Sequence, residues 1–308
     1  MEPSSFTYKL TPHQGVTLKA QLEAEGFTFA PLAHGHFQAT KGKCKVAFYL
    51  SGKLVVQGKG AREWIEFSLE PLVLGEARLG YEEVVDPEMF SPHFGIDESG
   101  KGDFFGPLVV AGAYVDAELC RELAALGVKD SKRIGSDPKA IALSAEIQRV
   151  LRGKCEVLVI GPARYNELYG RFGNLNRMLA WAHAKVIELL CAKMPDCPRA
   201  LSDQFANPAL IQRELNAKGL GIQLDQRIKA ESDLAVAAAS VLARAEFLQR
   251  LDRLGTEAGV RLRKGASASV KAIGVEIVRR GGQDALRAVA KAHFKTFAEC
   301  IEEGREAS

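Results

Sequence analysis

The chain lacks any apolar run approaching the roughly 20 consecutive residues that a helix needs to cross a bilayer, and it has no apolar leader. It also lacks tracts of biased composition, since 47% of its 308 residues are hydrophobic and 26% are charged. These absences disfavour membrane and disordered proteins and predict a globular chain. The length allows two domains.

Cysteine is sparse and scattered. The six cysteines stand at positions 44, 120, 155, 191, 197 and 300, and no second close pair joins Cys191 and Cys197 to complete a zinc site. We therefore expect reduced thiols and a cytoplasmic protein.

Acidic residues are missing from one segment. A formal net charge of +3 is too small to prove a polyanionic partner, but residues 41–62 contain six basic residues and no acidic one. This segment is either a positive surface for phosphates or the solvated face of an amphipathic sheet, and composition does not choose between them.

Hydrophobic spacing predicts a small domain at residues 1–80. Val16, Leu18 and Leu22 have helical spacing, residues 45–50 and 53–57 resemble strands, and Ser51-Gly52 is a plausible hairpin turn between them. Residues 81–92 are acidic, aperiodic and interrupted by prolines, which indicates a linker. A second domain then covers residues 93–308.

The second domain alternates strand and helix patterns. Strands are expected to end at Asp97 and at Asp203, and the apolar runs 107–115 and 155–160 have strand length. Helices are expected at about 176–191 and 233–254. This order predicts an α/β (α+β) fold in which helices flank a mixed sheet.

The most informative motif is Gly-Ile-Asp-Glu-Ser-Gly-Lys-Gly-Asp-Phe-Phe-Gly-Pro at 95–107. Two adjacent carboxylates at a strand end suit hard cations, and glycines with a lysine suit a phosphodiester backbone. Adjacent strand residues point to opposite faces, so Asp97 and Glu98 share a site only if the chain bends or one acts from the edge. A turn with solvated acids is the alternative. A dinucleotide fingerprint is disfavoured because Gly106 comes one residue late and Pro107 opens a strand.

Ordered matches to one family follow. Residues 95–115 resemble the first strand and loop of type 2 ribonucleases H, and Gly-Lys-Gly at 100–102 before Asp-Phe-Phe-Gly-Pro is similar to the HIII branch. Similar motifs stand at 129–132, 200–205, 229–232, 237–244, 264–267 and 290–294. Together they span most of residues 94–297.

The resemblance implies four catalytic, metal-binding carboxylates: Asp97, Glu98, Asp203 and Glu231. For Glu231, pairing with the N-terminal dipole of the next helix is the competing interpretation. Crowded carboxylates repel one another unless cations are present, and Mg²⁺ or Mn²⁺ fits such oxygen ligands. The family's chemistry is two-metal hydrolysis that leaves a 5′-phosphate and a 3′-hydroxyl.

The resemblance also implies how the substrate is bound. Backbone groups of Gly100, Lys101 and Gly102 would contact the 2′-hydroxyl, which distinguishes RNA from DNA. Ser131 and Lys132 match positions near the scissile phosphate, although either has an ordinary surface interpretation. A lone histidine on an apolar segment is usually structural, so His293 is left out of the catalytic set.

Residues 38–58 resemble the extra domain of HIII enzymes, which has a fold similar to TATA-binding protein. That resemblance implies hybrid binding, with Lys43, Lys53 and Lys59 as phosphate contacts. The expected function is therefore an endonuclease, acting as a monomer, that cuts the RNA strand of RNA/DNA hybrids. Two alternatives stay open: a non-catalytic nucleic-acid-binding protein, and HII-like incision at single ribonucleotides in DNA.

Overall fold

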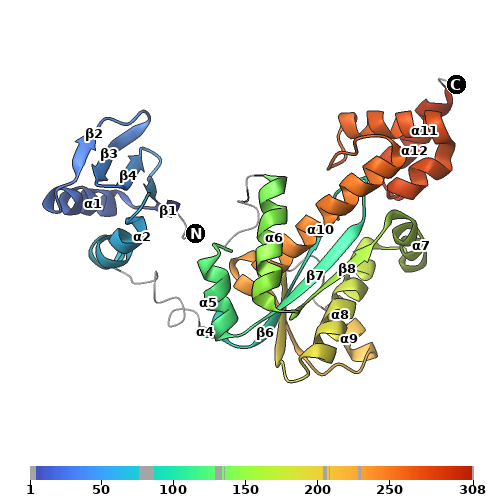
Figure 1. Ribbon diagram of the computed structural model, residues 1–308, viewed down its shortest axis with the longest axis horizontal. Coiled ribbons are helices and arrows are strands. Elements are labelled where there is room, and N and C mark those ends of the chain that lie inside the picture. Colours follow the sequence, from blue (N-terminus) through green and yellow to red (C-terminus); the bar gives the residue numbers. More distant parts are fainter. Residues whose placement is uncertain are drawn as a thin grey trace. The chain divides into compact units, whose positions relative to one another are not determined.

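The computed structural model describes residues 5–75, 87–128, 134, 136–203, 207, 209–227 and 230–306. The chain divides into two compact units, Met1–Phe90 and Ser91–Ser308. In Figure 1 the first unit is blue, and the second runs from cyan through green and yellow to red. Residues 81–86, half of the segment interpreted as a linker, lie outside the described residues.

The N-terminal unit is an antiparallel sheet packed against helices, in the strand order β1-β5-β4-β3-β2. Its strands are β1 (Ser5–Lys9), β2 (Thr28–Ala30), β3 (Gly35–Lys41), β4 (Cys44–Tyr49) and β5 (Lys53–Gln57). Its helices are α1 (Pro12–Ala24), α2 (Ala61–Trp64), the π-type helix η1 (Ile65–Leu74) and α4 (Pro87–Phe90). The helix and the hairpin predicted here are both present.

Strand alternation separates the two faces of this sheet. Phe48 is 5% exposed and packs in one core with Phe37, Leu54 and the buried Leu18 of α1. Phe48 is therefore a core residue. Residues of the opposite parity, such as Lys45, point away from that core.

The C-terminal unit contains the predicted mixed sheet, which has five strands in the order β10-β9-β6-β7-β8. Its strands are β6 (His93–Ser99), β7 (Leu108–Val115), β8 (Cys155–Ile160), β9 (Arg199–Asp203) and β10 (Gln223–Arg227). The β6–β7 and β7–β8 pairs are antiparallel, whereas β9 is parallel to both β6 and β10.

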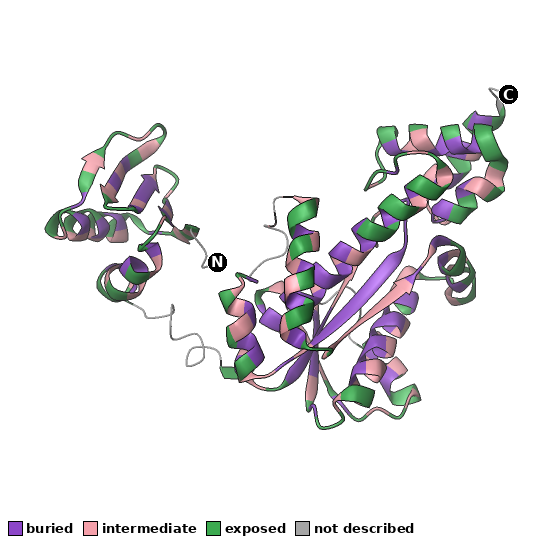
Figure 2. Cartoon of the chain, in the orientation of Figure 1, coloured by how far each residue is buried: buried purple, intermediate pink, exposed green. Residues whose placement is uncertain are grey.

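Helices cover both faces of this sheet (Figure 1). They are α5 (Ala117–Ala125), α6 (Asp137–Leu151), α7 (Pro162–Phe172), α8 (Leu175–Lys193), α9 (Ala209–Ala217), the 3-10 helix η3 (Ala230–Ser232), α10 (Leu234–Ala258), α11 (Ala268–Val289) and α12 (Lys295–Glu306). Strands β6 and β7 are buried along most of their length (Figure 2).

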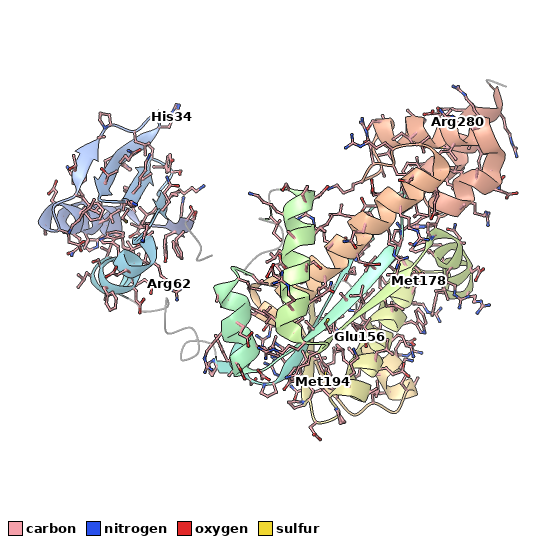
Figure 3. All side chains as sticks on the ribbon, in the orientation of Figure 1. His34, Arg62, Glu156, Met178, Met194 and Arg280 are labelled. Carbon is pink, nitrogen blue, oxygen red and sulfur yellow. The ribbon has the colours of Figure 1, made fainter. Side chains whose placement is uncertain are left out.

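The two covering layers pack on alternate residues of β6. Phe94 and Ile96 lie in the core that α8 completes with residues such as Met178, which Figure 3 labels. Gly95 points the other way, toward α10, where an added Cβ would lie 2.2 Å from the carbonyl carbon of Ala235. The absence of a side chain at Gly95 therefore lets α10 approach the sheet closely.

Each of the six cysteines, all within the described ranges, is a free thiol. Among the described residues, no helix is both long and apolar enough to span a membrane.

Candidate active site

Asp97 and Glu98 lie near the end of β6, beyond the point where β9 stops pairing with it. The parallel register ends at Ile96 opposite Ser202. The antiparallel ladder with β7 continues through Asp97, Glu98 and Ser99 without a shift. The strand therefore has no bulge here, and the two carboxylates occupy opposite faces of the sheet where β9 no longer pairs with β6.

Asp97 points to the face covered by α10. Its Oδ1 accepts a hydrogen bond from the Glu98 backbone N–H at 2.8 Å, and its side chain is hydrogen-bonded to Ser240 of α10. Burial raises the pKa of Asp97 to about 6, and the neighbouring charge of Glu98 adds to the effect. A nearby cation would lower this pKa, because it favours the charged form of the carboxyl group.

Glu98 points to the face covered by α8. Its Oε2 is 3.1 Å from Nε2 of His183, and its Oε1 is 3.6 Å from Nζ of Lys101. Burial acts to raise the pKa of Glu98, but hydrogen bonding and charge from His183 and Lys101 outweigh it and hold the pKa below its ordinary value. Glu98 is thus an ionised carboxylate held between two donors.

Asp203 and Glu231 come from neighbouring segments. The parallel register places Asp203 beside Asp97 and on the same face, because Ile96 pairs with Ser202 one residue earlier. The backbone N–H of Ala230 donates to Oδ1 of Asp203 at 3.3 Å, and Glu231 follows in η3. Asp97 and Asp203 therefore come from the α10 side, and Glu231 lies in the turn that precedes α10.

The acidic residue at the N-terminus of α10 is Asp233, whereas the competing interpretation placed Glu231 there. The Asp233 carboxylate accepts from the backbone N–H groups of Ala235 and Val236 at 2.8 and 3.2 Å and caps α10. It also lies 3.1 Å from Nε2 of the fully buried His93 of β6. This contact fixes the start of α10 against the sheet, two residues after Glu231.

The glycine-rich loop turns sharply after β6. Gly100 has φ +88°, and a Cβ there would lie 2.3 Å from the Pro107 carbonyl oxygen, so the turn requires glycine. Lys101 is half-buried and Gly102 is exposed. Ser131 and Lys132, the other substrate residues predicted near this site, lie outside the described residues.

Contacts from the C-terminal segments hold the other half of this loop. The Asp103 Oδ1 accepts from the Gly265 N–H at 2.6 Å, and the Gly265 carbonyl accepts from the Phe104 N–H at 3.0 Å. The fully buried Lys291 donates from Nζ to the Asp103 carbonyl at 2.7 Å. Burial lowers the pKa of Lys291 to about 7.

The donor set suits a hard divalent ion. Carboxylate oxygens are the ligands that Mg²⁺ and Mn²⁺ prefer. Within the described ranges, no three His, Cys, Asp or Glu side chains stand in a ready metal-binding group. Asp97, Glu98 and Asp203 each accept a hydrogen bond from a protein donor.

Several residues of the site could not be recognised in the sequence. His183 lies among apolar residues of α8 and contacts Glu98. Ser202 precedes Asp203 on β9 and contacts His183. The one available signal was a histidine on the buried side of a helix, which usually indicates core packing. His293, which is not expected in the site, stacks on Tyr169 with ring centroids 4.3 Å apart.

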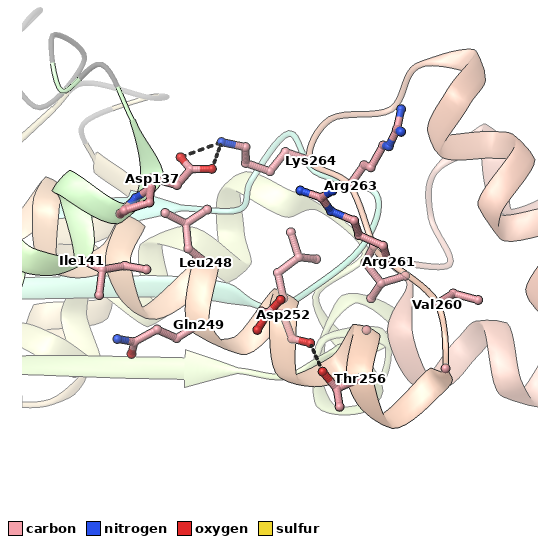
Figure 4. A pocket seen from close by; sticks show the side chains of 15 residues that line it. Asp137, Ile141, Leu248, Gln249, Asp252, Thr256, Val260, Arg261, Arg263 and Lys264 are labelled. Carbon is pink, nitrogen blue, oxygen red and sulfur yellow. Dashed lines mark hydrogen bonds and ion pairs between the residues drawn. The ribbon is translucent and has the colours of Figure 1, made fainter.

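A separate pocket of about 970 Å³ lies between α6, α10 and the segment after α10 (Figure 4). Its lining includes Arg261, Arg263 and Lys264, and Lys264 forms an ion pair with Asp137 at 2.7 Å. None of the four predicted carboxylates lines it. The chemistry is therefore expected at the strand ends and not in this pocket.

Comparison with known proteins identifies the family of the chain. The family model described as Ribonuclease HII matches residues 94–297. Ribonuclease HIII of Protochlamydia amoebophila is 43% identical over 280 residues, covering 91% of each chain. Ribonuclease HIII of Chlamydia abortus is 42% identical, covering 96% of each chain.

Solved structures give the same result for the fold. The crystal structure of Bst-RNase HIII in complex with Mn²⁺ has a TM-score of 0.69 and 27% identity, covering 98% of this chain and all of that one. The Aquifex aeolicus ribonuclease of the same branch has a TM-score of 0.54 and 26% identity over 94% of this chain. The chain therefore belongs to the ribonuclease HII family, and its full-length relatives are ribonucleases HIII.

Proposed function

We propose that the protein is a metal-dependent endonuclease that hydrolyses the RNA strand of RNA/DNA hybrids, with Asp97, Glu98, Asp203 and Glu231 as its catalytic carboxylates. The observation that supports this most directly is the register of β6 and β9, which brings Asp97 and Asp203 together at neighbouring strand ends. Family membership supports the reaction class.

The residues around the carboxylates have distinct tasks in this proposal. Bound Mg²⁺ or Mn²⁺ supplies activation of water and stabilisation of the departing 3′ oxygen. The carboxylates of Asp97 and Asp203 approach from the α10 side, Glu231 from the turn that precedes α10, and Glu98 from the α8 side. The tight turn at Gly100 presents the exposed backbone of Gly102 beside them, where an N–H or carbonyl can contact a 2′-hydroxyl.

A cleavage assay tests the assignment. The purified full chain is offered an RNA/DNA hybrid, a duplex with one embedded ribonucleotide, and plain DNA, each with Mg²⁺ or Mn²⁺. We expect cleavage of the hybrid, its loss in Asp97→Asn, and its retention in the matched control Asp284→Asn, which changes an exposed carboxylate of α11.

Other outcomes select the alternatives. Hybrid binding without cleavage under either metal would favour a non-catalytic binding protein. Preference for the duplex with one ribonucleotide would favour HII-like incision. Full cleavage of the hybrid by the Asp97→Asn variant would refute the proposed active site.

We further propose that the N-terminal unit binds the hybrid through the sheet face opposite α1. Lys9 of β1 and Lys53 of β5 are direct register partners on this face, and Lys45 of β4 shares it. The Lys9 ammonium donates to the Ser51 carbonyl, and phosphates would offset the remaining repulsion between the like charges of Lys9 and Lys53. Lys43 and Lys59, also expected to bind, are exposed beyond the strand ends.

Salt-dependent binding tests this surface. Replacing Lys9 and Lys53 with glutamine should weaken hybrid binding and lower the slope of log K against log salt by about 0.9 for each phosphate that the protein no longer neutralises. Lys19→Gln is the matched control, because Lys19 lies on α1 and pairs with Glu23 at 3.9 Å. If the wild type, the Lys9 and Lys53 variant and the Lys19→Gln control all gave the same slope of log K against log salt, the assignment of this face would be refuted.

Two finer proposals concern the protein in the cell. We propose that it works in the cytoplasm, supported by six free thiols, and as a monomer, supported by a separate buried core in each unit. Light scattering during gel filtration tests the second proposal, since a dimer mass would contradict it.

A further inference from the structure

His183 connects two strands of the candidate site from within the α8 layer. Its imidazole is fully buried. Nε2 lies 3.1 Å from Oε2 of Glu98 at the end of β6, and Nδ1 lies 3.1 Å from the Ser202 hydroxyl of β9. That hydroxyl is in turn 3.1 Å from the carbonyl oxygen of Asp203. One side chain thereby links Glu98 to the strand end that presents Asp203.

Packing alone does not account for a histidine at this position. Its neighbours Ala182, Ala184, Val186 and Ile187 are all buried in an apolar core. An apolar side chain would fill the same space without the cost of desolvating an imidazole, about 1–3 kcal/mol for a polar group judged from protein variants. Ser202, also fully buried, adds a second polar group to the same layer.

The direction of the hydrogen bond is fixed by chemistry. An ionised carboxylate only accepts, so Nε2 of His183 carries the hydrogen and donates to Glu98. This bond fixes one oxygen of a side chain that otherwise has three rotatable bonds. The second oxygen, Oε1, faces Lys101 on the loop side.

We infer that His183, supported by Ser202, is a positioning residue that holds the Glu98 carboxylate and the end of β9 in the arrangement needed to bind a divalent ion. This inference depends on the proposed metal site. Hydrogen-bonding partners that orient metal-ligating groups typically change metal affinity or activity 10–100-fold when removed.

Binding of Mn²⁺ alone to the full chain, measured by titration calorimetry, tests the inference without relying on turnover. His183→Leu fills the space but cannot donate, and we expect it to bind Mn²⁺ about 10–100-fold more weakly. His183→Gln keeps an N–H donor and should recover part of that loss. Ser202→Ala should weaken binding less, and the double variant should be no worse than His183→Leu, because both changes break one chain of hydrogen bonds.

Cleavage kinetics separate positioning from packing. If His183 positions a metal ligand, saturating Mn²⁺ should restore most of kcat in His183→Leu, with little change in KM for the hybrid. The matched control for Ser202→Ala is Ser144→Ala, which changes another buried serine, bonded to Gln148 within α6, and should bind Mn²⁺ as the wild type does.

The outcomes distinguish this inference from the proposed function. Wild-type Mn²⁺ affinity in a folded His183→Leu protein would overturn the positioning role while Asp97→Asn still abolishes cleavage. Unchanged cleavage in Asp97→Asn would overturn the proposed site first. If circular dichroism shows that His183→Leu does not fold, His183→Gln and Ser202→Ala decide, and wild-type affinity in both overturns the role.

Discussion

The close approach of α10 to β6 at Gly95 makes a single methyl group a severe perturbation. In Gly95→Ala the new Cβ would lie 2.2 Å from both the Ala235 carbonyl carbon and the Val236 nitrogen. Both neighbours are backbone atoms, which cannot rotate away as a side chain can. Overpacking of a core typically costs about 1–3 kcal/mol, and we expect Gly95→Ala to reach about 3 kcal/mol.

This cost should be visible in thermal unfolding followed by circular dichroism. A unit of this size loses about 2–4 °C per kcal/mol, so the midpoint should fall by about 6–12 °C. Cleavage should fall as well, even where the protein is folded, because moving α10 separates Ser240 from Asp97 and shifts Glu231.

A second glycine provides a control for which the expected change in stability has the opposite sign. Gly170 lies in α7, and no described atom outside its own helix backbone lies within 4 Å of the position that a methyl group there would take. Gly170→Ala should therefore raise stability by about 0.5–1 kcal/mol through helix propensity. A Gly95→Ala protein that melts and cleaves as the wild type does would refute the close packing of α10 on β6.

Two further predictions concern buried charges. Lys291 has a pKa of about 10.5 when unfolded and about 7 when folded, so it binds its proton more readily in the unfolded chain, and its contribution to stability rises between pH 7 and 10.5. Lys291→Met should therefore remove on the order of 2 kcal/mol of the increase in the free energy of unfolding in urea between pH 7 and 9. An unchanged increase would contradict the buried ammonium. Asp233→Ala removes a helix cap and leaves Nε2 of buried His93 without its carboxylate partner, while Nδ1 keeps its contact with the Ser91 carbonyl, so we expect a loss of about 2–4 kcal/mol in the same urea assay. Asp116→Ala, which removes a partly exposed cap of α5, should cost about 1 kcal/mol, and equal losses would refute the His93 contact.

Local patterns predict the main elements of the C-terminal unit. Strands β6 and β9 are recognisable as apolar runs that lead to carboxylates, although β6 continues to Ser99, two residues beyond its predicted end at Asp97. The mixed sheet follows from the alternation of strands and helices. The side of the sheet on which each carboxylate lies is not recognisable. That depends on how far the β6–β7 ladder continues past the last β9 pairing, which tertiary packing decides.

The partners of the carboxylates are also beyond sequence reasoning. His183 and Glu98 are 85 positions apart, and His93 and Asp233 are 140 apart. A single sequence places no constraint on such pairs, because each histidine fits an ordinary amphipathic pattern. Similarly, nothing local distinguishes Lys291 from a surface lysine, because the loop carbonyl that it binds belongs to Asp103, 188 positions away.

The unbroken ladder of β6 has a consequence for how strongly each unit resists proteolysis. The ion that we propose Asp97 and Glu98 bind would join the α8 layer to the α10 layer through one strand. Ligand binding at 100 times its dissociation constant adds about 2.7 kcal/mol to the free energy of unfolding. The N-terminal unit, with its own core, shares none of this gain. Divalent ion supply should therefore set the resistance to proteolysis of residues 91–308 and leave that of residues 1–90 unchanged.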